Sequence, residues 1–270
     1  MKVHFLGTAA FEGIPSLFCE CTTCRQARER GGNNIRSRTS VMIDNVLKVD
    51  FPPDTFYHSL QYGLDMNSVQ DLLITHSHSD HLYAEDMAIR AEGYAQAGDR
   101  SIHVYGHDIP FRLCFQALNG MTHNYKFHRV IPFEPMKTQT STIVPLLADH
   151  DPLETCLLYY IEKDGKSILY GNDSGWFPEQ TWAFLKDKKL DLAILECTTG
   201  RVPHRNNHMS VDAVLDTKLW MDENSVLKPG APVIVTHFSH NAGLLHEDLT
   251  DIFKPHGIQV AYDGLIVDIP

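Results

Sequence analysis

The sequence predicts a layered α/β protein. Short apolar runs typical of strands alternate along the chain with segments that favour helices. The 270 residues are enough to bury one large core, and no repeat, low-complexity tract or Pro/Gly/Ser linker divides them. Strands clustered at the start and in the middle, with helices between them, fit two mixed sheets packed face to face. We therefore expect a single domain over residues 1–270.

The first half of the chain begins with a predicted strand at residues 3–6, and the glycines and proline of residues 7–15 predict an irregular turn after it. Residues 39–43 and 46–49 alternate apolar and polar side chains, which predicts a hairpin turning at Asp44-Asn45. The Ala-rich segment 85–96 favours a helix. Other helices are expected at 25–30, 54–62 and 108–118, and other strands at 72–75, 102–105 and 127–131.

The second half continues the same alternation. Three closely spaced strands predict the second sheet, and residues 162–166 form a good hairpin turn between the last two of them. These strands are expected at 142–148, 156–161 and 167–170. The pattern is completed by segments 179–185, 190–195, 211–221, 233–235, 245–253, 259–261 and 265–269.

Composition excludes several classes of function. The formal net charge of −11 disfavours a general polynucleotide binder, which needs Lys and Arg to neutralise phosphates, so nucleic acid is not the expected partner. No apolar stretch approaches the roughly 20 residues of a membrane span, and the first residues read as a strand instead of a signal peptide. We expect a cytoplasmic protein without a membrane partner, and leave a homodimer open.

Three imidazoles and a carboxylate follow the buried run 72–75 within six residues. In an extended chain His76 and His78 project to the same side, while Asp80 and His81 fall at the following turn. A catalytic ion usually takes three protein ligands and leaves one position for water, so four ligands in one loop predict two adjacent ions. The alternative is a solvated His-rich surface loop.

The pattern His76-x-His78-x-Asp80-His81 after a strand resembles the signature of the metallo-β-lactamase superfamily of binuclear metallohydrolases. This resemblance implies an αββα sandwich of two mixed β-sheets flanked by helices. It also implies a single His, a bridging Asp and a final His at later strand ends, where the sequence has His150, Asp173 and His237. By resemblance, one ion is held by His76, His78 and His150, the other by Asp80, His81 and His237, and both by Asp173.

The superfamily also has an earlier Asp that holds the His loop by hydrogen bonds, and Asp50 matches it. A turn-forming Asp before Pro52 is an equal alternative. Oxygen and nitrogen ligands without a thiolate accept Zn²⁺, Mn²⁺ or Fe²⁺, so the identity of the two divalent ions stays open.

A second metal signature is the run Cys19-x-Cys21-x-x-Cys24, which predicts a zinc-binding loop at residues 19–24. Three thiolates need a fourth ligand, and His240, three residues after His237, could complete a closed structural Zn²⁺ site. The alternative is a redox-active or disulfide-forming cluster, which a reducing compartment disfavours.

Together, these motifs resemble those of the cyclic-phosphate phosphodiesterases of the carbon-phosphorus lyase pathway. The resemblance implies hydrolysis of a small cyclic phosphodiester by metal-bound hydroxide, with Asp80 both a ligand and a catalytic residue. His208 lies just before the expected N-cap Ser210 of a helix, where anions are favoured, and is the candidate general acid or phosphate-orienting group. His204, in the same loop, is the alternative candidate for this role.

The sequence leaves other functions open. Within the same superfamily, one alternative is a tRNA-processing or other nuclease, and a less favoured one is a thioester or lactam hydrolase. An alternative outside the enzymes is a non-enzymatic zinc protein like the one in pyrroloquinoline quinone biosynthesis. The complete set of open-site ligands disfavours this last alternative.

Overall fold

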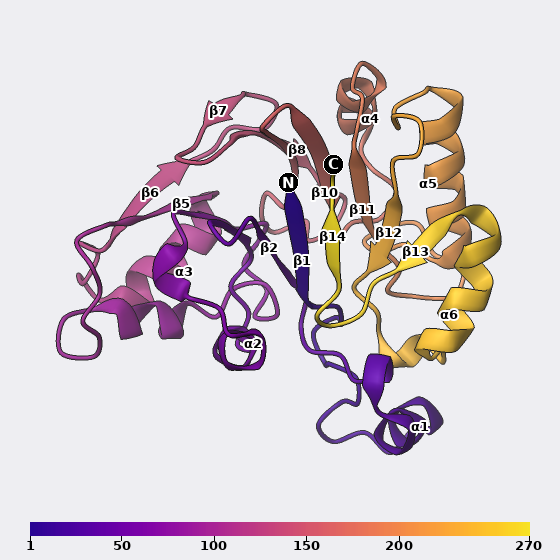
Figure 1. Ribbon diagram of the computed structural model, residues 1–270, viewed down its shortest axis with the longest axis horizontal. Coiled ribbons are helices and arrows are strands. Elements are labelled where there is room, and N and C mark those ends of the chain that lie inside the picture. Colours follow the sequence, from indigo (N-terminus) through magenta and orange to yellow (C-terminus); the bar gives the residue numbers. More distant parts are fainter.

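Two seven-stranded β-sheets face each other in the middle of the molecule (Figure 1). The computed structural model describes residues 1–270. The first sheet has the order β14-β1-β2-β3-β4-β5-β6. Its strands are β1 (Lys2–Gly7), β2 (Ser40–Ile43), β3 (Leu47–Val49), β4 (Asp71–Leu73), β5 (Ile102–Gly106), β6 (Tyr125–Arg129) and β14 (Ile266–Asp268).

The second sheet has the order β13-β12-β11-β10-β9-β8-β7. Its strands are β7 (Met136–Lys137), β8 (Thr142–Leu147), β9 (Leu157–Lys163), β10 (Lys166–Gly171), β11 (Leu192–Glu196), β12 (Val233–Thr236) and β13 (Ile258–Val260). The strands from β10 to β13 are parallel, and so are those from β3 to β6. Residues that follow neighbouring parallel strands therefore meet at one edge of each sheet.

Helices cover the outer faces of both sheets. Figure 1 shows α2 and α3 beside the first sheet, α4, α5 and α6 beside the second, and α1 projecting at the bottom. The α-helices are α1 (Thr22–Arg30), α2 (Thr55–Tyr62), α3 (Asp108–Leu118), α4 (Glu179–Lys186), α5 (Val211–Glu223) and α6 (His246–Phe253). The 3-10 helices are η1 (Gly32–Asn34), η2 (Met66–Ser68), η3 (Ala84–Arg90), η4 (His240–Ala242) and η5 (Lys254–His256). This arrangement confirms the expected αββα sandwich.

The space between the sheets is filled by apolar side chains from both of them. β1 contributes Val3 and Phe5, β10 contributes Ile168 and Tyr170, and all four are fully buried. Burial of each large apolar side chain stabilises the fold by about 1.5–3 kcal/mol. Two further apolar clusters lie between each sheet and its own helices. The strand ends that carry the candidate site are thus fixed by packing on both sides.

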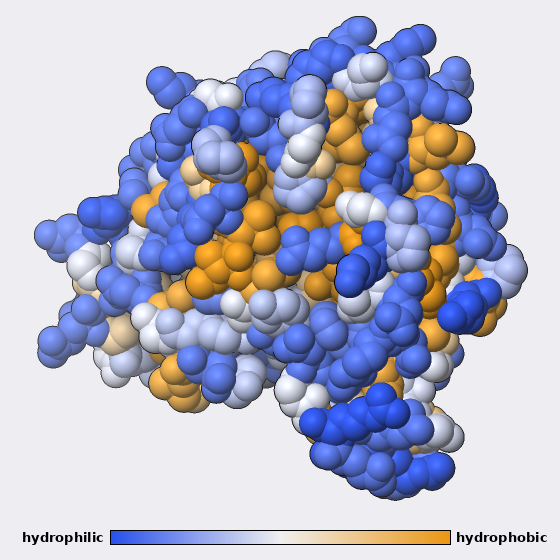
Figure 2. Space-filling view, turned by 45° about the vertical axis from the view of Figure 1, so that its right-hand side comes forward, coloured by the Kyte–Doolittle hydropathy of each residue, from blue (hydrophilic) through white to orange (hydrophobic).

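The surface carries both hydrophobic and hydrophilic residues. On the face in Figure 2, hydrophobic residues gather in a band across the middle, and the segment around α1 that projects at the bottom is hydrophilic. None of the helices is both long enough and apolar enough to span a membrane.

Two predicted elements differ clearly from the structure, and one strand of the structure was not predicted. The helix expected at 85–96 is wrong, because only the 3-10 helix η3 forms there and Gly93 has a left-handed φ of 96° that no helix can continue through. β6 begins and ends two residues before the strand expected at 127–131, and the short strand β7 was not predicted. The hairpin turn at Asp44-Asn45 is confirmed, with φ of 50° and 60°.

Candidate metal centre

The seven side chains predicted to hold the catalytic ions lie together, although they come from both sheets. Within each of two groups, all donor atoms lie within 4.8 Å of one another. One group consists of His76, His78, His150 and Asp173. The other group consists of Asp80, His81, Asp173 and His237. Asp173 is shared by the two groups, which is the position that a bridging ligand requires.

Asp173 is the centre of this arrangement. Its Oδ2 atom faces the Nε2 atoms of four histidines, at 3.0 Å from His81, 3.3 Å from His76 and His150, and 3.6 Å from His237. Burial raises the pKa of this carboxyl group, but the surrounding imidazoles outweigh burial and hold the pKa well below its usual range. The carboxylate is therefore ionised at neutral pH, as a metal ligand must be.

The buried polar atoms at the centre fit a pair of divalent ions. His76 Nε2 and Asp173 Oδ1 are buried and make no hydrogen bond of good geometry, although Asp173 Oδ2 lies 3.3 Å from the first atom and His208 Nδ1 lies 3.0 Å from the second. Imperfectly paired polar atoms are costly to bury, and a bound cation would satisfy both of them. Asp173 and His237 each have a left-handed φ of 58°, a strained backbone conformation that is common at functional sites.

The ring nitrogens that point away from the centre have partners of their own. His81 Nδ1 lies 2.7 Å from Asp50 Oδ2, and His237 Nδ1 lies 2.8 Å from Thr198 Oγ1. The Thr75 backbone nitrogen also donates to Asp50 Oδ1 at 2.9 Å. Such partners fix the orientation of a ligating imidazole. Asp50 thus has the supporting position that the resemblance implies, and the turn-forming alternative is disfavoured.

His208 lies beside the two donor groups. Its Nδ1 atom hydrogen-bonds Glu196 Oε1 at 2.8 Å and lies 3.0 Å from Asp173 Oδ1. Burial lowers the pKa of His208, but the Glu196 and Asp173 carboxylates outweigh burial and raise it to about 11. Its competitor His204 is exposed, and its ring makes no hydrogen bond. Of these two histidines, only His208 is brought to the centre.

Glu196 is a functional candidate that the sequence analysis missed. It is fully buried and ends β11, which runs parallel to β10 and β12 on either side. Those two strands lead into Asp173 and His237. The position of an acidic residue at the end of β11, between these two strands, was therefore a signal that could have identified Glu196.

Gly175 allows the loop that carries His208 to approach the centre. A Cβ atom at Gly175 would lie 2.2 Å from the Arg205 carbonyl oxygen and 2.6 Å from the Asn207 nitrogen, which are backbone atoms and cannot move alone. We expect Gly175→Ala to lower the free energy of unfolding by about 1–3 kcal/mol, measured in urea, and to lower kcat/KM. Gly98→Ala, where a methyl group meets nothing within 4 Å, is the control. Wild-type stability and activity in Gly175→Ala would contradict the role of this contact.

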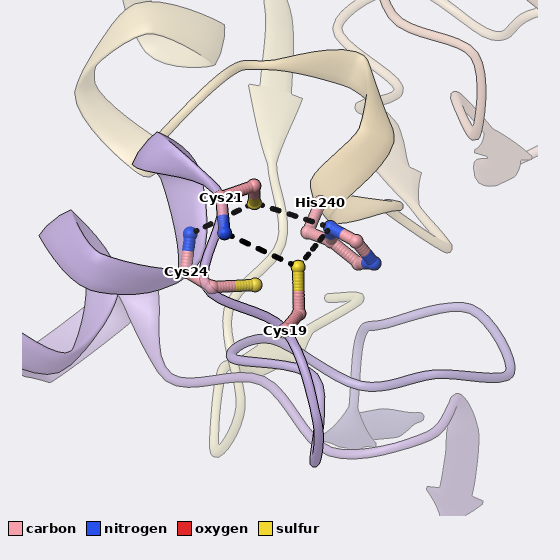
Figure 3. A group of neighbouring side chains, drawn as sticks. All are labelled: Cys19, Cys21, Cys24 and His240. Carbon is pink, nitrogen blue, oxygen red and sulfur yellow. Dashed lines mark hydrogen bonds between the residues drawn. The ribbon is translucent and has the colours of Figure 1, made fainter.

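The cysteine loop and His240 also come together. Figure 3 shows the three sulfur atoms and the His240 ring converging from segments far apart in the sequence. His240 Nδ1 lies 3.6 Å from Cys19 Sγ and 3.4 Å from Cys21 Sγ, and all four donor atoms lie within 4.8 Å of one another. The other ring nitrogen, His240 Nε2, lies 3.6 Å from Glu12 Oε1. Three thiols and one imidazole in this arrangement fit a closed tetrahedral zinc site.

A zinc ion in this loop would contribute to folding, because the unfolded chain lacks the assembled site. We therefore expect Cys21→Ser to lower the melting temperature and to remove one tightly held zinc ion per chain, measured by elemental analysis after dialysis. Cys114→Ser, at a buried cysteine outside the loop, should keep that ion. Unchanged zinc content and melting temperature in Cys21→Ser would rule out the zinc site.

Comparison with solved structures finds the same fold in several proteins. A diphosphatase of the PhnP family is 23% identical, with a TM-score of 0.77 over 100% of this chain and 98% of that one. Zn²⁺-bound PqqB from Methylobacterium extorquens is 14% identical, with a TM-score of 0.71 over 99% and 100%. The short form of human tRNase Z is 16% identical, with a TM-score of 0.70 over 100% of both chains. At these identities the likeness concerns the fold.

No curated protein matches the sequence. Residues 40–238, however, match the model of the β-lactamase superfamily domain. This match spans more than half of the chain and includes all seven residues of the two donor groups. The protein therefore belongs to the metallo-β-lactamase superfamily of metal-dependent hydrolases.

Proposed function

We propose that the protein is a binuclear metal-dependent phosphodiesterase that hydrolyses a small cyclic phosphodiester. The observation that carries this proposal is that two groups of nitrogen and oxygen donors share one carboxylate, Asp173. In this proposal one ion is held by His76, His78 and His150, and the other by Asp80, His81 and His237. Two such ions, when bound, supply an activated water and a positive clamp for the phosphoryl oxygens.

The protein's own groups would then handle the leaving oxygen. Glu196 Oε1 accepts a hydrogen bond from His208 Nδ1, so His208 Nε2 is the nitrogen that we assign to the substrate. From that position His208 would donate a proton to the leaving group or orient the phosphate. Asp80 Oδ2, 3.5 Å from His237 Nε2, is the second side chain that we assign to the reacting centre.

We also propose that residues 1–270 act as one domain. His76, His78, Asp80 and His81 follow β4 of the first sheet, whereas the other three ligands follow strands of the second sheet. Neither sheet could hold both ions by itself. The cysteine loop would add a structural Zn²⁺, and the catalytic pair would be Mn²⁺, Zn²⁺ or Fe²⁺.

A small substrate is favoured over a polynucleotide by the net charge of −11, because affinity for nucleic acid rests on neutralising many phosphates. The fold is shared with tRNase Z, so RNA belongs among the substrates to be tested.

One substrate panel tests the proposal. Metal-free protein is reloaded with Mn²⁺ or Zn²⁺ and assayed on cyclic ribose phosphates, cyclic nucleotides, bis-p-nitrophenyl phosphate, RNA and a lactam. We expect metal-dependent turnover of the small diesters, with the highest kcat/KM on a cyclic one. Preferred cleavage of RNA or of the lactam would overturn the substrate class. No turnover of any compound would favour a non-enzymatic zinc protein.

A further inference from the structure

The loop between β8 and β9 contains three acidic side chains that bind two other segments of the centre. Asp149 Oδ2 accepts from the Asn207 backbone nitrogen at 3.1 Å, in the loop that leads to His208. Asp151 Oδ2 lies 3.2 Å from His78 Nε2. The same loop carries the candidate ligand His150. Its acidic residues thus connect the segments that carry several functional side chains.

His78 is the candidate ligand least held by packing. Its side chain is 41% exposed, whereas those of the other four candidate histidines are at most 3% exposed. A ring this exposed can rotate and can carry its proton on either nitrogen unless a partner fixes it. Its ring makes edge contacts with the rings of His76 and His150, but these contacts do not decide which nitrogen carries the proton, so that choice must come from hydrogen bonds.

The contacts of His78 assign different tasks to its two nitrogens. Nδ1 lies 3.0 Å from His150 Nε2, so it faces the donor group. Nε2 faces the Asp151 carboxylate. An ionised carboxylate has no proton to donate, so it acts only as a hydrogen-bond acceptor. This pairing places the ring proton on Nε2 and leaves the Nδ1 lone pair directed at the centre.

A second acidic residue holds the backbone on which His78 sits. Glu154 accepts from the Ser77 backbone nitrogen at 3.0 Å and from Ser77 Oγ at 2.6 Å. Ser77 lies between the candidate ligands His76 and His78, so Glu154 fixes the segment and Asp151 fixes the ring.

We propose that Asp151 is a positioning residue that makes His78 Nδ1 a metal ligand by holding the ring in its Nε2-protonated form. This inference rests on the proposed function, because it assumes the ion pair. Hydrogen-bond partners of ligating histidines typically change metal affinity or activity by about 10- to 100-fold when removed. Asp151 itself would touch neither ion nor substrate.

The test is a metal titration of metal-free protein with Co²⁺, followed by visible absorption and by competition with a chelator. We expect wild type to bind two ions at the donor groups and Asp151→Ala to weaken one of them about 10- to 100-fold, with the other unchanged. The amide oxygen of Asp151→Asn can still accept from Nε2, so the metal affinity of this variant should lie between those of wild type and Asp151→Ala. The ¹⁵N shifts of His78 in metal-free protein should report a loss of the Nε2-protonated form in Asp151→Ala.

The control is Asp108→Ala, at an exposed aspartate 3.8 Å from His107 and outside both donor groups. It should leave both affinities unchanged, and circular dichroism checks that every variant is folded. Two unchanged affinities in Asp151→Ala would overturn the inference. So would a further wild-type ion, beyond the pair and the ion of the cysteine loop, that is lost in Asp151→Ala, because the donor atoms of His78, Asp151 and Glu154 would then themselves form a site. If wild type binds no pair of ions, the proposed function fails instead.

Discussion

Asp173→Ala should abolish hydrolysis and release at least one catalytic ion, while the fold is kept. The Asp173 carboxylate is the only side chain shared by both donor groups, and its Oδ2 lies within 3.6 Å of four imidazole nitrogens. Without it, those nitrogens face one another across the centre and the two ions lose their common ligand. Metal ions contribute several kcal/mol to such reactions, so we expect kcat/KM to fall by at least about 10³-fold.

The measurement is kcat/KM together with metal content after dialysis against buffer, with the melting temperature as a check on the fold. Asp191→Ala is the matched control, because Asp191 is a buried aspartate that pairs with Lys228 and directly precedes β11, at the end of that strand away from Glu196. It should lose stability but keep its metal and its activity. Full metal content and full activity in Asp173→Ala would remove Asp173 from the bridging position.

The positions of the candidate ligands could be predicted because they follow strands. A short motif such as that from His76 to His81 is local in the sequence, and a histidine or aspartate directly after an apolar run is visible without knowledge of the fold. Neighbouring parallel strands then bring Asp173 and His237 to the same edge. The resemblance to the metallo-β-lactamase signature implied which later residues to expect, and the order of the strands agrees with their meeting at one edge.

The partners of these ligands could not be predicted in the same way. Asp151 and His78 are 73 positions apart, and their contact depends on how two loops from different sheets meet. Asp151 also looks like any acidic residue beside a proline in a turn. The failed helix at 85–96 has a related cause, since its high helix propensity was outweighed by Gly93 and by the packing of η3 against α3.

His208→Ala should slow hydrolysis of an alkyl or ribose diester far more than hydrolysis of a p-nitrophenyl diester. An alkoxide leaving group needs a proton, whereas p-nitrophenolate is a weak base and leaves without one. General acid catalysis typically contributes about 10²- to 10⁴-fold, so a loss of this size is expected on the alkyl substrate only. Glu196 holds His208 Nδ1 at 2.8 Å, so Glu196→Gln should show the same substrate dependence with a smaller loss.

The two substrates are compared by kcat/KM under identical metal loading, with both ions confirmed in each variant. His204→Ala is the matched control, because His204 belongs to the same loop but is exposed and makes no side-chain hydrogen bond. It should keep wild-type rates on both diesters. Equal losses on both substrates in His208→Ala would mean that His208 binds the phosphate and does not donate the proton. No loss on either substrate would exclude His208 from the reaction, and water would then be the proton source for the leaving oxygen.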